Sequence, residues 1–442
     1  MDKNKKNKLG LVFFPAFDWA ISPTHPEREE RLLYTRDQII EEGLLDMDSI
    51  REYKPKMASL KDLQRVHIAV PDIPSLITDA HLVSAGGAIT AAEAVMKKEV
   101  QRSFALVRPP GHHAMKVIHG TRGFCTVNIE AIMVEYLRQR YNIKKVAIVD
   151  TDVHHGDGTQ DIFYHDPDTL FISLHQDGRT LYPGTGDKTE MGSPGAFAST
   201  INIPLSPGTT DEGLHYVLDN LILPVLGDFK PDLIINSAGQ DNHYTDPLAS
   251  MAVSAQGYAR LAEKLNADIA VLEGGYSIED ALPYVNTGII LAMAGLDYSK
   301  VIEPDIRRCP KQTERNTDAV KKTVEYLQDI WANRKKLKEE AIERANGFYN
   351  MQNRVYYDDS GITEKQVQSV KLCPDCNGYL TIVTEATGNY IGHQTAFAGV
   401  IPRNCCSKCQ ALAKDAMLKA KKQNNYEHYF LQNKIEDTYE EI

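Results

Sequence analysis

One stretch decides the fold expected of this chain: Val146-Ala147-Ile148-Val149-Asp150-Thr151-Asp152-Val153-His154-His155-Gly156-Asp157-Gly158. Its first half is a run of small and β-branched apolar residues, which is typical of a strand buried on both faces. Its second half holds aspartates and histidines, which are costly to bury unless they are paired or bind a cation. If the extended geometry continues, Asp150, Asp152 and His154 share a face. This pattern predicts a site for zinc or a similar ion, whereas a solvated acidic loop is the alternative.

Length and composition narrow the class of protein. The chain has 442 residues, enough for a large α/β domain and a smaller module, and its net charge of −11 argues against nucleic acid as a partner. The start is rich in lysine, but the apolar run at 9–14 is too short for a signal peptide, and no stretch is long enough to cross a bilayer. Seven cysteines, most of them near the C-terminus, do not suggest a disulfide framework. We therefore expect a cytoplasmic protein that binds no membrane.

Apolar runs typical of strands alternate with helical patterns through most of the chain. We expect strands at 9–14, 104–107, 146–149, 170–174, 200–203, 233–235 and 269–272, and helices at 85–98, 128–141, 210–226, 254–265 and 280–294. This alternation predicts an α/β fold with a mostly parallel sheet that is flanked by helices. In such sheets, ligands bind outside the carboxyl ends of the strands.

The residues suited to chemistry do follow the predicted strands. Besides the stretch quoted above, they are Arg108-Pro109-Pro110-Gly111-His112-His113, His175-Gln176-Asp177, Tyr182-Pro183-Gly184-Thr185-Gly186, Ser237-Ala238-Gly239-Gln240-Asp241 and Glu273-Gly274-Gly275-Tyr276. We therefore expect five strand ends to bring histidines, aspartates and tyrosines to one edge of the sheet.

The end of the chain has a different character. We expect a large domain at 1–335, a helix end and linker at 336–363, and a small zinc-ribbon-like module with a C-terminal helix at 364–442. Two Cys-x-x-Cys knuckles, flanking a hairpin from 379–384 and 396–401, predict a structural zinc bound by Cys373, Cys376, Cys406 and Cys409. Cys405 could replace Cys406, and reduced cysteines without a metal are the other interpretation.

The motifs resemble those of the zinc-dependent histone deacetylase family, which includes bacterial and archaeal deacetylase-like amidohydrolases and acetylpolyamine amidohydrolases. The resemblance rests on the motifs after the strands, on Ser173-Leu174-His175, and on His25-Pro26-Glu27-Arg28 and Arg31-Leu32 near the start. It covers about residues 9–330 and does not include the cysteine module. It implies an arginase-like α/β fold.

The resemblance implies how the metal would be held. Asp152, His154 and Asp241 would bind a catalytic zinc, with iron(II) as a possible alternative, and leave one position open. Asp150 would orient His112, although alternation along the strand would also let it bind the metal.

The resemblance also implies the acid–base residues. His113, oriented by Asp157, would be the general base for the zinc-bound water and then the acid for the departing amine. His112 would act mainly as an electrostatic partner, and Tyr276 would donate a hydrogen bond to the oxyanion. A structural Gly-His-His turn and an aromatic helix start are the alternatives without function.

Further positions are implied for the substrate and for a second cation. Gly123, Phe124 and Tyr182 would line the acyl-lysine stem, although both aromatics could equally pack in a core, and Asp72 would hold substrate backbone amides. A structural potassium ion would be held by the Ser173 hydroxyl and by backbone carbonyls of Asp150, Asp152, His154 and Leu174.

These features predict an enzyme that hydrolyses the amide of N-acetyl-lysine in proteins to acetate and a free amine. An acetylated polyamine or another small acylated amine is the alternative substrate, and Leu248 stands where some polyamine-specific relatives have a glutamate. A non-catalytic protein that binds acyl groups is the alternative from another class. The sequence leaves the oligomeric state open.

Overall fold

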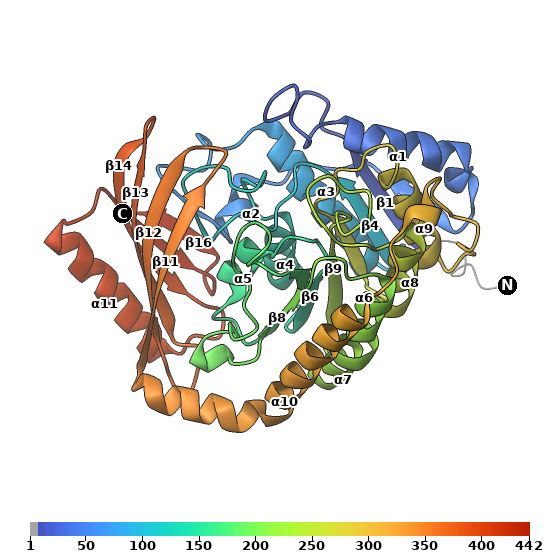
Figure 1. The fold of residues 1–442 in the computed structure, drawn as a ribbon. Helices are drawn as coiled ribbons and strands as arrows, with labels where there is room; N and C mark the ends of the chain where they lie inside the picture. The colour runs from blue at the N-terminus through green and yellow to red at the C-terminus, as the bar shows by residue number, and fades with distance from the viewer. Residues whose placement is uncertain (1–7) are drawn as a thin grey trace.

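The computed structural model describes residues 8–442, so residues 1–7, most of the lysine-rich start, lie outside the described range. Figure 1 shows a large α/β domain and, on its left, a C-terminal module of long strands. Helix α10 (Glu314–Ala345) runs along the lower edge and connects the two. No helix in the described range combines the length and the apolar character needed to span a bilayer.

The large domain is built on an eight-stranded sheet in which every neighbouring pair is parallel, in the order β2-β1-β4-β10-β9-β6-β7-β8. The strands are β1 (Leu9–Phe14), β2 (Ile50–Tyr53), β4 (Arg102–Val107), β6 (Val146–Asp150), β7 (Thr169–Gln176), β8 (Thr200–Leu205), β9 (Leu233–Ala238) and β10 (Ile269–Leu272). Two short strands, β3 (Ile68–Ala69) and β5 (Val117–Ile118), pair separately. The predicted α/β fold with a parallel sheet is confirmed, and β2 adds an edge strand that we did not predict.

Helices cover both faces of this sheet. They are α1 (Glu30–Glu41), α2 (Leu60–Gln64), α3 (Asp79–Met96), α4 (Ile129–Tyr141), α5 (Asp157–Phe163), α6 (Asp211–Val217), α7 (Leu223–Phe229), α8 (Ala255–Leu265) and α9 (Leu282–Ala294), with a π-helix at Leu218–Ile222 and 3-10 helices at Leu44–Asp46, Pro194–Ala196 and Ile306–Arg308. Capping side chains fix the residue at which some of these helices begin. Asn128, Thr210, Ser254 and Thr313 each accept a hydrogen bond from a backbone N–H in the first turn of the helix that follows.

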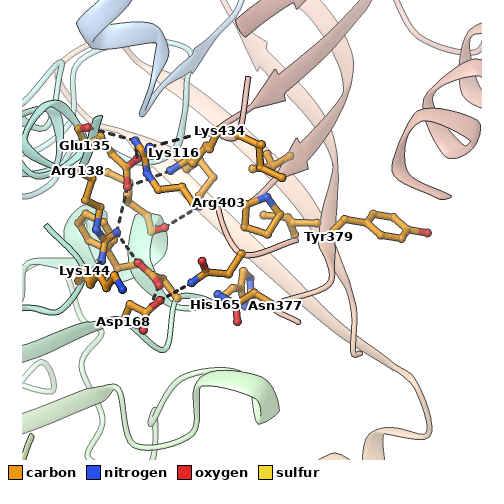
Figure 2. A pocket seen from close by; sticks show the side chains of 18 of the residues that line it. Lys116, Glu135, Arg138, Lys144, His165, Asp168, Asn377, Tyr379, Arg403 and Lys434 are labelled. Atoms are coloured by element: carbon orange, nitrogen blue, oxygen red, sulfur yellow. Dashed lines mark hydrogen bonds and ion pairs between the residues drawn. The ribbon is translucent and has the colours of Figure 1, made fainter. Parts of the chain in front are cut away.

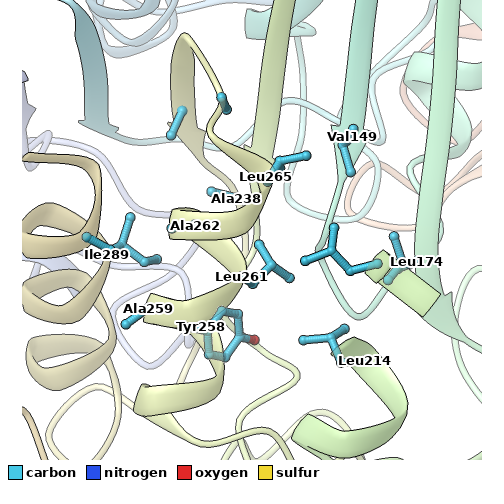
Figure 3. Close-up of a cluster of buried hydrophobic side chains, with 14 of the residues drawn as sticks. Val149, Leu174, Leu214, Ala238, Tyr258, Ala259, Leu261, Ala262, Leu265 and Ile289 are labelled. Carbon is cyan, nitrogen blue, oxygen red and sulfur yellow. The ribbon is translucent and has the colours of Figure 1, made fainter. Parts of the chain in front are cut away.

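Side chains of the strands alternate between two apolar clusters, one on each face. On β6, Ala147 and Val149 belong to a cluster covered by α1 and α6 to α10, whereas Val146 and Ile148 belong to one covered by α2 to α5. Figure 3 shows part of the first cluster, where α8 packs against sheet residues such as Val149. Both faces of β6 are thus covered by apolar side chains. Only its carboxyl end can carry polar groups without a large cost in free energy.

The C-terminal module is a six-stranded sheet in the order of the sequence, with one helix, α11 (Ser407–Gln423), against β13, β14 and β15. Its strands are β11 (Phe348–Tyr357), β12 (Ile362–Lys371), β13 (Tyr379–Gly388), β14 (Gly392–Ile401), β15 (His428–Asn433) and β16 (Thr438–Glu441). The predicted hairpin between the cysteine pairs is present as β13 and β14, and is longer than we expected.

Our expectation of a linker up to residue 363 is wrong, because β11 and the first residues of β12 occupy that stretch. The two strands pair antiparallel over their full length. β11 is an edge strand, and its sequence, FYNMQNRVYY, has few aliphatic residues on either face. The apolar alternation that marks most strands is therefore missing.

The module packs on the large domain through a polar face of β12. Glu364, Gln366 and Gln368 alternate along that face and are buried, and Gln368 Nε2 donates to Asp161 Oδ1 of α5 at 2.7 Å. A cavity of about 510 Å³ remains between the two units, lined by charged side chains of both (Figure 2). In it, Glu135 of α4 pairs with Arg403 of the module at 3.1 Å.

Candidate active site

Three buried ligand groups meet where two neighbouring strands end. Asp152 and His154 follow β6, and Asp241 follows β9. Their ligand atoms lie within 4.8 Å of one another, and His154 Nδ1 lies 3.1 Å from both Asp152 Oδ1 and Asp241 Oδ2. The structure thus brings together the three residues predicted to bind the catalytic metal. Two carboxylates and one imidazole form a donor set that suits zinc.

Backbone packs directly against these carboxylates. A Cβ at Gly274 would lie 2.3 Å from Asp241 Oδ2 and 2.6 Å from Asp152 Oδ2, so no larger residue fits there. The Gly274 N–H donates to Asp152 Oδ2, and the Val153 N–H donates to Asp241 Oδ1, each at 2.8 Å. These bonds hold one oxygen of each carboxylate and leave Asp152 Oδ1 and Asp241 Oδ2 facing His154.

Each of the tandem histidines after β4 is held by a carboxylate: His112 by Asp150 at the end of β6, and His113 by Asp157 at the start of α5. His112 Nδ1 lies 3.0 Å from Asp150 Oδ2, and His113 Nδ1 lies 2.8 Å from Asp157 Oδ1. The ring centroids of the two histidines are 4.1 Å apart. A carboxylate at Nδ1 fixes the orientation of a ring and leaves Nε2 to face a reactant. Asp150 pairs with His112 in this arrangement and is not part of the group of three ligands.

The two imidazoles differ in their electrostatic surroundings. Burial alone would lower the pKa of His112, but the nearby carboxylates of Asp152 and Asp150 outweigh it and raise this pKa to about 10. Burial, with the positive charge of His112, lowers the pKa of His113 to about 3. His113 is therefore the neutral ring of the pair, and a neutral imidazole is the form that can accept a proton.

Arg122 was not predicted as a site residue. Its Nη1 donates to Asp157 Oδ1 at 2.8 Å, and its Nη2 lies 2.6 Å from Asp157 Oδ2. Burial by itself would raise the pKa of Asp157, but the Arg122 guanidinium and the hydrogen bond with His113 outweigh it and hold this pKa below its usual range. No motif marked Arg122, because its contact with Asp157 joins residues far apart in the chain.

Tyr276 closes the site from the loop after β10. Its side chain is 7% exposed, its ring centroid lies 5.6 Å from that of Phe124, and the Arg31 guanidinium lies 4.9 Å from the ring. The Tyr276 N–H donates to Asp246 Oδ2 at 2.7 Å. Burial raises the pKa of the phenol well above its ordinary value, so the hydroxyl is a hydrogen-bond donor at neutral pH.

The glycine loop that carries Tyr276 is held by the opening motif of the chain. Arg31 donates to the carbonyls of Gly275 at 2.7 Å and of Glu273 at 2.6 Å, and it also binds the Glu27 carboxylate. Arg108 Nε donates to the other oxygen of Glu27 at 2.7 Å. Glu27, Arg31 and Arg108 belong to motifs quoted above, and the structure shows that they fix the loop.

A second unpredicted group is a pair of buried carboxyls. Glu273 Oε2 accepts hydrogen bonds from the N–H groups of Gly111 at 2.8 Å and His112 at 3.1 Å. Burial raises the pKa of Glu273 well above its usual range and that of Glu130 beside it to about 7. The two hydrogen bonds to Glu273 Oε2 hold the turn before His113 in place.

Three of the residues predicted to contact the substrate gather beside His113, and we call Gly123, Phe124 and Tyr182 the rim residues. The Tyr182 ring centroid lies 5.2 Å from that of His113. Tyr182 is 37% exposed, so the rim faces solvent. The Asp72 carboxylate accepts a hydrogen bond from Ser75 N at 2.9 Å, and within residues 8–442 no hydrogen bond joins it to the rim residues.

The residues predicted to hold potassium line neighbouring strands. Ser173 of β7 stands opposite Asp150 of β6 in the sheet register, and both Ser173 and Leu174 are buried. The Ser173 hydroxyl lies 2.9 Å from His175 Nδ1.

The cysteines of the module form a second candidate metal group. The sulfur atoms of Cys373, Cys376, Cys406 and Cys409 lie within 4.8 Å of one another. The first two precede β13, and the other two lie at the start of α11. Cys405 is buried beside this group but is not a member of it. Four thiols at this separation are a possible tetrahedral zinc site.

Comparison with known proteins agrees with the fold. Residues 72–293 match the family description "Histone deacetylase domain". A "Probable deacetylase" of Archaeoglobus fulgidus is 47% identical over 324 residues, which are 67% of this chain and 89% of the relative. A "Histone deacetylase-like amidohydrolase" of Pseudomonas aeruginosa is 32% identical and covers 64% of this chain and 81% of the relative. The crystal structure of the HDA15 HD domain has a TM-score of 0.65 and 27% identity, and covers 77% of this chain and 99% of its own.

Proposed function

Because this chain belongs to the histone deacetylase family, we propose that it removes the acetyl group from N-acetyl-lysine in proteins. Relatives named deacetylase and amidohydrolase support the hydrolysis of an amide, and metal dependence is general in the family. The observation that carries the proposal is the meeting of Asp152, His154 and Asp241 beside the His113–Asp157 pair.

The residues present fit a catalytic zinc. Asp152, His154 and Asp241 would hold the ion through two carboxylates and one imidazole, which leaves a coordination position for a reactant. When bound, the ion would polarise the acyl carbonyl and lower the pKa of water. Iron(II) suits the same oxygen and nitrogen donors.

The side chains around this group supply the proton transfers. His113 Nδ1 is engaged by Asp157, so Nε2 is the atom that takes the proton of the attacking water and later gives it to the departing amine. His112, held by Asp150, adds positive charge beside the developing oxyanion. Tyr276 donates its hydroxyl proton in a hydrogen bond to that oxyanion.

Two further ions belong to the proposal. A structural zinc bound by Cys373, Cys376, Cys406 and Cys409 would cross-link the β13 end of the sheet to α11. A potassium ion would lie between the ends of β6 and β7, held by the Ser173 hydroxyl and by the carbonyls of Asp150, Asp152, His154 and Leu174. The register of the two strands, with Asp150 opposite Ser173, supports the second site.

A substrate panel tests the proposal. The purified chain would be assayed for acetate release from acetyl-lysine peptides, acetylated polyamines and other acylated amines, with and without chelator, and with Zn(II) or Fe(II) added back. We expect chelator-sensitive hydrolysis of the peptides. Preference for polyamines would replace the proposed substrate, and binding of acyl peptides with no acetate release from any substrate would favour a non-catalytic binding protein.

A further inference from the structure

The turn between β11 and β12, formed by Asp358, Asp359, Ser360 and Gly361, reaches from the C-terminal module to the rim of the active site. Backbone N–H groups of segment 121–124 donate to its side chains. Thr121 N–H donates to Ser360 Oγ at 2.9 Å, Gly123 N–H to Asp358 Oδ1 at 3.0 Å, and Phe124 N–H to Asp359 Oδ2 at 2.8 Å. Three successive side chains of one unit thus bind the backbone of the other.

The segment they bind is a strained turn. Arg122 and Cys125 exchange both of their backbone hydrogen bonds at 2.9 Å, which leaves Gly123 and Phe124 at the tip. These two residues have φ values of +51° and +69°. Glycine adopts positive φ readily, but an aromatic residue does so only at a cost in free energy, so the conformation needs support from its surroundings. The carboxylates of Asp358 and Asp359 provide it, because they accept hydrogen bonds from the two N–H groups at the tip.

The same turn also holds the other wall of the rim. The Tyr182 hydroxyl lies 3.2 Å from Asp358 Oδ1, the atom that accepts from Gly123 N–H. Gly123 lies so close to His113 that a Cβ there would be 2.5 Å from His113 Cδ2. A displacement of the turn at 121–124 would therefore move both the rim residues and the imidazole of His113.

We propose that Asp358 and Asp359 are positioning residues, through which the C-terminal module sets the shape of the rim and the efficiency of the reaction. The proposal rests on the deacetylase function argued above. Neither carboxylate acts on the reacting atoms, and both work through Gly123, Phe124 and Tyr182. The module is then part of the working enzyme, and not only an appended docking unit.

Two double variants of the full-length protein test this. In Asp358→Ala with Asp359→Ala, the acceptors are lost, whereas in Asp358→Asn with Asp359→Asn, an amide oxygen remains to accept the same bonds. Asp415→Asn, at an exposed position of α11, is the control for loss of a carboxylate elsewhere in the module. Hydrogen–deuterium exchange of the peptide that covers 119–125 reports the contact itself, and kcat and KM with an acetyl-lysine peptide report its consequence.

We expect the alanine pair to speed exchange at 119–125 and to lower kcat/KM, mainly through a higher KM, each by about 10-fold or more. The reason is the loss of three hydrogen bonds to charged groups, two from the backbone and one from the Tyr182 hydroxyl. The asparagine pair should lose clearly less than the alanine pair, because neutral acceptors remain although the charge is gone. The control should remain within about 3-fold of wild type, since it leaves both carboxylates of the turn intact. Unchanged exchange in the alanine pair would refute the contact whether or not the enzyme is active. Faster exchange with unchanged kcat/KM would refute the positioning role. A wild-type protein that hydrolyses no acylated amine would refute the proposed function, and the exchange data would still decide the contact.

Discussion

Glu364→Gln should make the protein more stable at alkaline pH and change little at acidic pH. Glu364 is fully buried where the module meets the large domain. Its Oε1 accepts hydrogen bonds from Thr384 at 2.6 Å and Gln366 at 3.1 Å, and its Oε2 lies 2.8 Å from the Tyr357 hydroxyl. That hydroxyl also lies 2.9 Å from the carbonyl of Val117. Tyr357 has one proton for two acceptors, so a protonated Glu364 satisfies the network and an ionised one does not.

The size of the effect follows from the pKa. Burial raises the pKa of Glu364 from 4.5 to about 7. The folded state therefore holds the proton more tightly than the unfolded chain, and stability is lost as the pH rises from the unfolded to the folded pKa. At about 1.4 kcal/mol for each pKa unit, the loss over this window is about 3 kcal/mol. Glutamine does not titrate, and its amide group can accept from Thr384 and donate to Tyr357.

Unfolding in denaturant at about pH 5 and pH 8 would measure this, with the variant and the wild type compared at each pH. We expect the stability advantage of the variant to grow by about 3 kcal/mol between the two conditions. Glu440→Gln, at an exposed position of the edge strand β16, should show no such growth. An advantage that is equal at both pH values would refute the reasoning, because it would show that the pKa of Glu364 is the same in the folded and unfolded states.

Three other perturbations address the proposed chemistry. Tyr276→Phe keeps the buried ring but removes the hydroxyl that donates to the oxyanion. We expect kcat to fall by about 100-fold or more, while the amount of bound metal stays the same. A kcat within about 3-fold of wild type would contradict the oxyanion role. Asp157→Asn removes the charge that pairs with His113, and kcat/KM should fall by about 10- to 100-fold. The melting temperature should fall as well, because the buried Arg122 loses its charged partner. Activity near wild type would exclude Asp157 as the orienting group. Cys409→Ser should remove one equivalent of zinc per chain and lower the melting temperature of the module. Metal analysis measures the zinc content, and an unchanged content would refute the four-cysteine site.

The strands and their polar ends could be predicted from the sequence because these signals are local. The apolar run before Asp150 and the alternation of strands and helices require no knowledge of distant contacts, and parallel strands align their carboxyl ends. Asp152, His154 and Asp241 were therefore expected at one edge, and the structure brings them together. The edge strand β11 escaped prediction because its residues lack an apolar face, and a pattern-based method has no other signal there.

The order of residues specifies which groups stand at the strand ends, whereas the packing of distant segments specifies which of these groups face each other. Alternation let Asp150 bind a metal, but the three-dimensional arrangement pairs it with His112. The contacts of Arg122 with Asp157, of Arg31 with the loop of Tyr276, and of Asp358 with the rim residues all join segments far apart in the chain. Such partners depend on how the layers and the module pack, and packing is the sum of many contacts that no single motif encodes.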